Sequence, residues 1–73
     1  MTLNEKINLC RLLSMQTIAE AAVNSGYSRS AIYKIEEGRR KVPLSYIAYW
    51  VNKGLFDIND VSKYENTKKG VKS

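Results

Sequence analysis

The sequence predicts an all-α domain of five helices, and three observations support this fold class. Two capping boxes, formed by Thr2 with Glu5 and by Thr17 with Glu20, each mark the start of a helix. Apolar residues recur at intervals of three and four residues, which is the repeat of a helix face. No segment alternates apolar and polar residues as a half-buried strand does. We therefore expect helices alone to build the core.

The apolar spacing and the turn residues divide the chain into five expected helices. They cover about residues 3–13, 17–24, 29–37 and 43–53, followed by a short helix capped by Asp57 or Asn59. Cys10 lies on the apolar stripe of the first helix, so we expect a small buried hydrophobe there. The expected core face of the fourth helix comprises Leu44, Ile47, Ala48, Val51 and Leu55. Residues 65–73 have almost nothing to bury, which predicts a domain of residues 1–64 and a flexible basic tail.

Length and composition restrict the class of protein. Seventy-three residues form one small core, and an apolar content of 44% is ordinary for a folded chain. No apolar run approaches the ~20 residues that span a bilayer. No signal peptide is visible and the single Cys fits a reducing compartment, so we expect a cytoplasmic protein. The chain has no His, no metal-ligand spacing and no glycine-rich phosphate loop, so we expect no enzyme activity, metal, cofactor or small-molecule ligand.

The chain is organised around residues 19–37, where two short helices are expected to meet at a turn. Gly26 lies where the chain reverses, a position that suits a positive φ. Ile32 and Ile35 recur at i and i+3, so they share a buried face. The opposite face carries hydroxyl groups and cations: Ser28, Arg29, Ser30, Tyr33 and Lys34. A helix with an apolar back and a donor-rich front, braced by a shorter helix, fits a DNA groove.

The charge distribution favours a polyanionic partner. The chain carries twelve Lys and Arg against seven acids, which gives a net charge of +5. Five of the twelve cations lie within residues 29–41, along and just beyond the helix with the donor-rich face. A basic surface that contacts only solvent is the alternative interpretation.

These residues resemble the Cro/CI-type helix-turn-helix regulators, also called lambda-repressor-like domains. In that family a small residue lies four positions before the turn glycine, and aliphatic residues lie six and nine positions after it. Ala22, Gly26, Ile32 and Ile35 match this pattern, and GYSRSAIYKI looks most like the turn and recognition helix of small phage Cro proteins. Residues 35–43 resemble the family's aliphatic–Glu–x–Gly–basic segment. The similarity spans about residues 7–55.

The resemblance implies a compact five-helix lambda-repressor-like domain with the helix-turn-helix at its second and third helices. It implies a sequence-specific DNA-binding transcriptional regulator, a Cro-like repressor of a phage lysogeny/lysis switch, which inserts the third helix into the major groove of operator DNA. The implied base-reading residues are Ser28, Arg29, Ser30, Tyr33 and Lys34. The implied contacts with the DNA backbone come from Thr17, Arg39, Arg40 and Lys41.

Two further positions carry an implication from the family. Members often pair an arginine of the first helix with the glutamate after the recognition helix, and Arg11 and Glu36 match these positions. We expect a partly buried bidentate ion pair, with two unrelated exposed charges as the alternative.

Ile18 departs from the family, which often has a Gln there to contact phosphate. Thr17 and the helix N-terminus still favour an anion at this place.

One recognition helix contacts few base pairs, so we expect a homodimer on palindromic half-sites. The candidate protein–protein interface consists of aromatic and aliphatic residues of the last two helices: Tyr46, Tyr49, Trp50, Ile58, Val61 and Tyr64. The alternative is that these residues complete the core. A second class of function is also open, in which the protein is an antirepressor or modulator that binds the opposing phage repressor protein.

Overall fold

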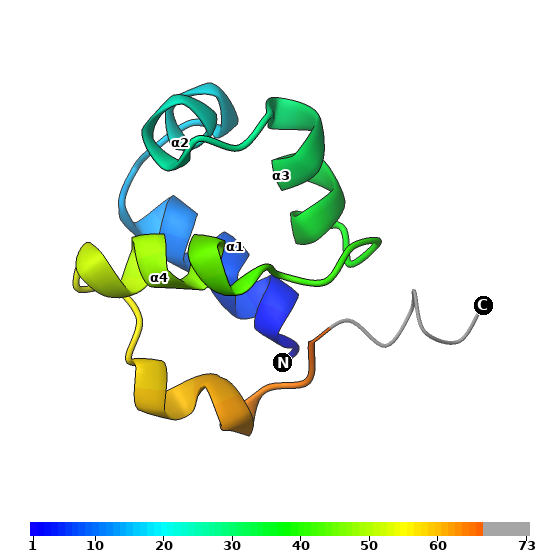
Figure 1. Ribbon diagram of the computed structural model, residues 1–73, viewed down its shortest axis with the longest axis vertical. Helices are drawn as coiled ribbons and strands as arrows, with labels where there is room; N and C mark the ends of the chain where they lie inside the picture. Colours follow the sequence, from blue (N-terminus) through cyan, green and yellow to red (C-terminus); the bar gives the residue numbers. More distant parts are fainter. Residues whose placement is uncertain (67–73) are drawn as a thin grey trace.

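The computed structural model describes residues 1–66 of the chain, which contain four α-helices and one 3₁₀-helix (Figure 1). In chain order they are α1 (Leu3–Leu13), α2 (Ile18–Ser25), α3 (Arg29–Glu36), α4 (Leu44–Asn52) and η1 (Ile58–Lys63). No strand occurs in this range, where the β-type pairing is an isolated bridge between Thr2 and Glu65. The prediction of an all-α fold with five helices is confirmed.

Both predicted capping boxes are present. The Thr2 hydroxyl accepts a hydrogen bond from the Glu5 N–H at 3.1 Å, and the Glu5 carboxylate accepts one from the Thr2 N–H at 2.8 Å. Thr17 and Glu20 repeat this arrangement at the start of α2 with the same two distances. Each box satisfies two N–H groups that would otherwise lack partners. The starts of α1 and α2 therefore follow from local sequence.

The turn between α2 and α3 depends on a glycine conformation. Gly26 ends α2 at φ 85° and its N–H donates to the Ala22 carbonyl at 2.9 Å. A Cβ added there would meet nothing within 4 Å, so the preference for glycine comes from the backbone angle and not from crowding. Two residues later the Ser28 hydroxyl accepts from the Ala31 N–H at 3.1 Å and caps α3.

The face of α4 that packs into the core differs in part from the predicted one. Of the predicted residues, Ile47 is buried, and Val51 and Leu55 are partly buried against the core. Tyr46, Ile47 and Trp50 are buried, whereas Leu44 is 69% exposed and Ala48 is exposed as well. Ile47 belongs to both possible faces, so helical spacing alone does not choose between them. The buried face carries two large rings, which remove more apolar area from water than Leu44 and Ala48 would.

The core lies between the helices and draws residues from each α-helix. Helix α3 packs against α1 and α2, and α4 packs against α1 and η1 (Figure 1). Cys10 of α1 is buried as predicted, and its Sγ donates to the Leu55 carbonyl at 3.3 Å. Burial raises the pKa of the Cys10 thiol, so the thiol is protonated and unreactive at neutral pH.

The chain returns to its own start after η1. The Leu3 N–H donates to the Glu65 carbonyl at 2.7 Å. The Asn66 side chain accepts from the Val42 N–H at 2.8 Å and donates to the Val42 carbonyl at 3.2 Å. The first two residues of the expected tail are thus held to the domain. Residues 67–73, the rest of that expected tail, lie outside the described residues.

Candidate nucleic-acid interface

Helix α3 separates its residues as the sequence predicts. Ile32 and Ile35 are completely buried. The five residues predicted to read DNA bases are all exposed: Ser28, Arg29, Ser30, Tyr33 and Lys34. Arg29, Ser30, Tyr33 and Lys34 lie on the side of α3 opposite Ile32 and Ile35. Ser28 lies just before the first helical residue, where its hydroxyl accepts from the Ala31 N–H as the N-cap. The structure therefore brings the predicted base readers together on one accessible, donor-rich surface.

An ion pair holds α3 against α1. The Arg11 Nε lies 2.6 Å from one Glu36 oxygen and the Arg11 Nη2 lies 3.1 Å from the other. The side chains of Arg11 and Glu36 are only 13% and 10% exposed, so this is the partly buried bidentate pair that the resemblance implies. Hydrogen bonding to Glu36 raises the pKa of Arg11. The Arg11 Nη1 also donates to the Gln16 carbonyl at 2.8 Å, which connects the α1–α2 loop to the pair.

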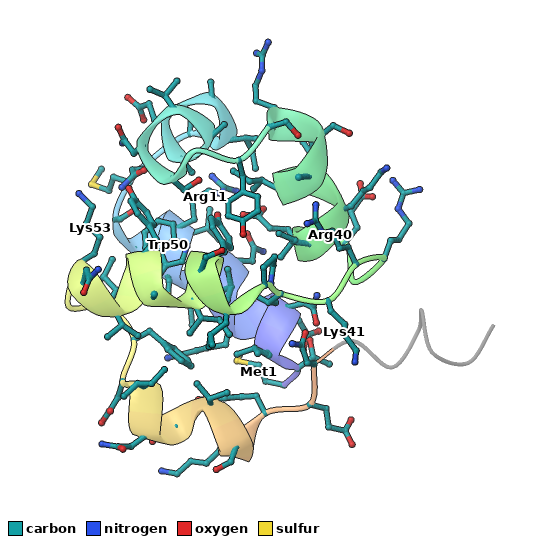
Figure 2. The ribbon with its side chains drawn as sticks, in the orientation of Figure 1. Met1, Arg11, Arg40, Lys41, Trp50 and Lys53 are labelled. Atoms are coloured by element: carbon teal, nitrogen blue, oxygen red, sulfur yellow. The ribbon has the colours of Figure 1, made fainter. Side chains whose placement is uncertain are left out.

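The three loop cations after α3, Arg39, Arg40 and Lys41, are exposed but differ in their contacts. The Arg39 guanidinium lies 2.9 Å from the Glu37 carboxylate in an exposed ion pair, which is a weak interaction. The Arg40 guanidinium lies over the ring of Tyr27, with 5.8 Å from Cζ to the ring centroid. Arg40 and Lys41 both lie on the segment between α3 and α4 (Figure 2). The predicted contacts of these residues with a DNA backbone stay a prediction.

A buried asparagine that the sequence analysis missed holds this loop in place. Asn4 is 1% exposed, and its Nδ2 donates at 2.8 Å to both the Ile35 carbonyl and the Arg40 carbonyl. It therefore joins α1 to the end of α3 and to the basic loop, the segment after α3 that carries Arg39, Arg40 and Lys41. The available signal was its spacing, because Asn4 lies three positions before the core residue Ile7 and so shares its face.

The N-terminus of α2 lacks the side chain that the family uses there. Thr17 is exposed and its hydroxyl caps α2. Ile18 is partly buried against the core, and so it does not face an anion. The neighbouring Gln16 turns toward α4, where its Nε2 lies 3.2 Å from the Tyr49 hydroxyl. Thr17 and the helix N-terminus itself are therefore the groups at this helix end that suit an anion.

The predicted protein–protein interface is wrong for two of its six residues. Tyr46 and Trp50 are completely buried, and Trp50 lies inside the domain (Figure 2). The rings of Tyr46 and Trp50 fill core volume that the smaller side chains of α4 would leave empty. Tyr49 is half-buried and packs edge-on against Trp50 at 4.8 Å between ring centroids. Ile58 is 48% exposed, and Val61 and Tyr64 are half-buried.

Two polar atoms in this aromatic cluster have no hydrogen-bond partner within the described residues. They are the Tyr46 hydroxyl and the Trp50 Nε1. Burial raises the pKa of Tyr46 to about 12, because the tyrosinate anion would lose its hydration.

Comparisons with protein-family models, with curated proteins and with solved structures found no match to this chain. None of the helices in residues 1–66 is long and apolar enough to cross a membrane. The same residues contain no group of three or more His, Cys, Asp or Glu side chains that could hold a metal ion.

Proposed function

We propose that the chain is a sequence-specific DNA-binding transcriptional regulator, with α2 and α3 as a helix-turn-helix and α3 as the recognition helix. The observation that carries this proposal is the division of α3, in which Ile32 and Ile35 are fully buried and the opposite side is exposed and rich in donors. Such a helix presents side chains to base edges in the major groove while a second helix braces it. The resemblance to Cro/CI-type regulators supports this function, and on that basis we propose a role in a phage genetic switch.

The exposed residues of α3 take different roles in this proposal. Arg29 is the main base reader, because its planar guanidinium can donate to both O6 and N7 of a guanine. Ser28, Ser30, Tyr33 and Lys34 contact neighbouring bases or sugars. Contacts with phosphate fix the register without reading sequence, and they come from Thr17, Arg39, Arg40 and Lys41.

The test is selection of binding sites from a pool of random DNA duplexes, followed by affinity measurements on the enriched sequence. Arg29→Ala should weaken binding to that sequence by about 1–3 kcal/mol and leave binding to random DNA nearly unchanged. Arg40→Ala should weaken both about equally. Equal weakening of both DNAs by Arg29→Ala would remove its role as a reader, and failure to enrich any sequence would refute the proposed function.

We also propose that the protein binds palindromic DNA as a homodimer. One α3 helix reads too few base pairs to select a site in a genome. With Tyr46 and Trp50 buried, the remaining candidate interface is Ile58 with the half-buried Tyr49, Val61 and Tyr64. Light scattering on the complex with a palindromic duplex should give two chains per duplex, and Ile58→Asp should reduce the cooperativity of binding.

A second candidate function is that of an antirepressor that binds the opposing phage repressor protein. The observation that favours it is a set of exposed apolar side chains on α1, on α2 and on the loop between them. Leu12, Leu13, Met15 and Val23 are 54%, 63%, 88% and 82% exposed. Exposed apolar side chains of this size are typical of protein-binding surfaces when they form a patch. A gel shift with operator DNA, with and without the neighbouring repressor, separates the two functions, because an antirepressor requires the repressor for its effect.

A further inference from the structure

The structure distinguishes one of the three loop cations from the other two. The Arg39 side chain is 62% exposed and pairs with Glu37, while Lys41 extends from the loop and is exposed. Arg40 instead rests on an aromatic ring, that of Tyr27. A guanidinium that lies over a ring still has N–H donors that can meet an anion.

The main chain at Arg40 is held as well as its side chain. The Arg40 carbonyl accepts the hydrogen bond from the buried Asn4 at 2.8 Å, which fixes the loop relative to α1. Two residues later, Val42 is held through its N–H and its carbonyl by the Asn66 side chain. The segment that carries Arg40 is thus anchored on both sides by distant parts of the chain.

The ring beneath Arg40 is itself fixed. The Tyr27 hydroxyl forms a hydrogen bond with the Ser45 hydroxyl at the start of α4. The Tyr27 ring packs edge-on against the fully buried Tyr46, with 5.5 Å between ring centroids. Tyr27 also follows the turn glycine directly and precedes the cap of α3. It therefore links the turn before α3 to the basic loop after α3.

We propose that Tyr27 is a positioning residue that holds Arg40 ready for a phosphate of the DNA backbone, and that Arg40 is for this reason the strongest of the three loop cations in DNA binding. This inference rests on the proposed function, because it assumes that the partner is DNA. Its physical basis is conformational entropy. A long side chain that is ordered before binding loses less freedom on contact with a phosphate than a free one does.

The test is a double-mutant cycle on a random-sequence duplex, measured at several salt concentrations. Tyr27→Leu should weaken binding roughly two- to tenfold, since Arg40 must then be ordered on binding, and should leave the salt slope unchanged. Arg40→Ala should reduce the slope by about 0.9 and weaken binding more than Arg39→Ala or Lys41→Ala, which are its matched controls. In the Arg40→Ala background, Tyr27→Leu should have no further effect. Tyr27→Phe keeps the ring and its packing on Tyr46 but loses the Ser45 hydrogen bond, so it should lose less affinity than Tyr27→Leu.

A second measurement needs no DNA. In the NMR spectrum of the free protein, the Arg40 side-chain protons should show an upfield ring-current shift that is kept in Tyr27→Phe and lost in Tyr27→Leu. Absence of this shift in the wild type overturns the inference. This measurement does not require Tyr27→Leu to fold. An equal effect of Tyr27→Leu with and without Arg40, or a larger loss from Arg39→Ala or Lys41→Ala, overturns it as well. A wild type that shows the shift but binds no duplex refutes the proposed function and the DNA role of Arg40, and leaves the ring contact standing.

Discussion

The ion pair between Arg11 and Glu36 provides the sharpest prediction about stability. Glu36→Ala removes both carboxylate contacts, at 2.6 and 3.1 Å, from a guanidinium that is 13% exposed. The Gln16 carbonyl remains as a neutral partner for Nη1. Leaving a mostly buried charge without its counter-ion costs about 3–5 kcal/mol. Because the Arg11 side chain is still partly exposed and keeps its contact with the Gln16 carbonyl, we expect a loss at the lower end of this range, about 3 kcal/mol.

That loss is large compared with the total stability of a domain of this size. At ~0.05–0.15 kcal/mol per residue, a 73-residue chain has roughly 4–11 kcal/mol in total. Since 1 kcal/mol shifts the Tm of a 60–100-residue domain by about 4–8 °C, Glu36→Ala should lower the Tm by at least about 12 °C. Thermal unfolding followed by circular dichroism at 222 nm measures this.

Two variants serve as controls for this prediction. Glu37→Ala removes the exposed pair with Arg39 and should change stability by less than about 1 kcal/mol. The double variant Arg11→Met with Glu36→Leu removes both charges and should be more stable than Glu36→Ala alone. A Tm of Glu36→Ala equal to that of Glu37→Ala would show that the pair contributes little, and the reasoning from burial would be refuted.

Three further predictions follow from single side chains. Tyr46→Phe removes a buried hydroxyl without a partner in the described residues, so stability at pH 7 in urea titrations should not fall. Folding raises the pKa of Tyr46 from about 10 to about 12, so the neutral form contributes stability below pH 10 that is lost as the pH rises from 10 to 12. Over this range the free energy of unfolding of the wild type should fall by roughly 2–3 kcal/mol. The Tyr46→Phe variant should not show this loss. Asn4→Ala removes one donor from the Ile35 carbonyl, which keeps the Gly38 N–H at 3.1 Å, and one from the Arg40 carbonyl. It should cost about 1–3 kcal/mol, and equal urea midpoints would contradict this. Met15 has φ 62°, so Met15→Gly should raise the Tm by a few degrees, and a lower Tm would show that the left-handed backbone is not strained.

The sequence predicted best those features that depend on neighbouring residues. The starts of α1, α2 and α3 follow from side chains within three positions of each cap, and Gly26 ends α2 for a reason that is local to its own φ. The exposed and buried sides of α3 were predicted because its two core isoleucines exclude the alternative face. In each case the competing conformations differ by interactions within one helical turn.

The sequence failed where two solutions fit the same local pattern or where partners lie far apart. Both faces of α4 contain Ile47, and only the volume of the assembled core favours the one with Tyr46 and Trp50. Asn4 bonds to carbonyls 31 and 36 residues away, and nothing in its own neighbourhood indicates which groups these are. Tyr27 likewise gains its role from Arg40 and Ser45, which reach it only after α3 has turned the chain back.

The bridge between Thr2 and Glu65 makes the two ends of the described chain depend on each other. The Leu3 amide is one of the first N–H groups of α1, which an isolated helix leaves to solvent, and its acceptor is the carbonyl of Glu65. A chain that stops at residue 64 would lose this acceptor and also the Asn66 contacts that hold Val42 beside the basic loop. Removal of residues 65–73 would therefore loosen the start of α1 and the loop that carries Arg40 together.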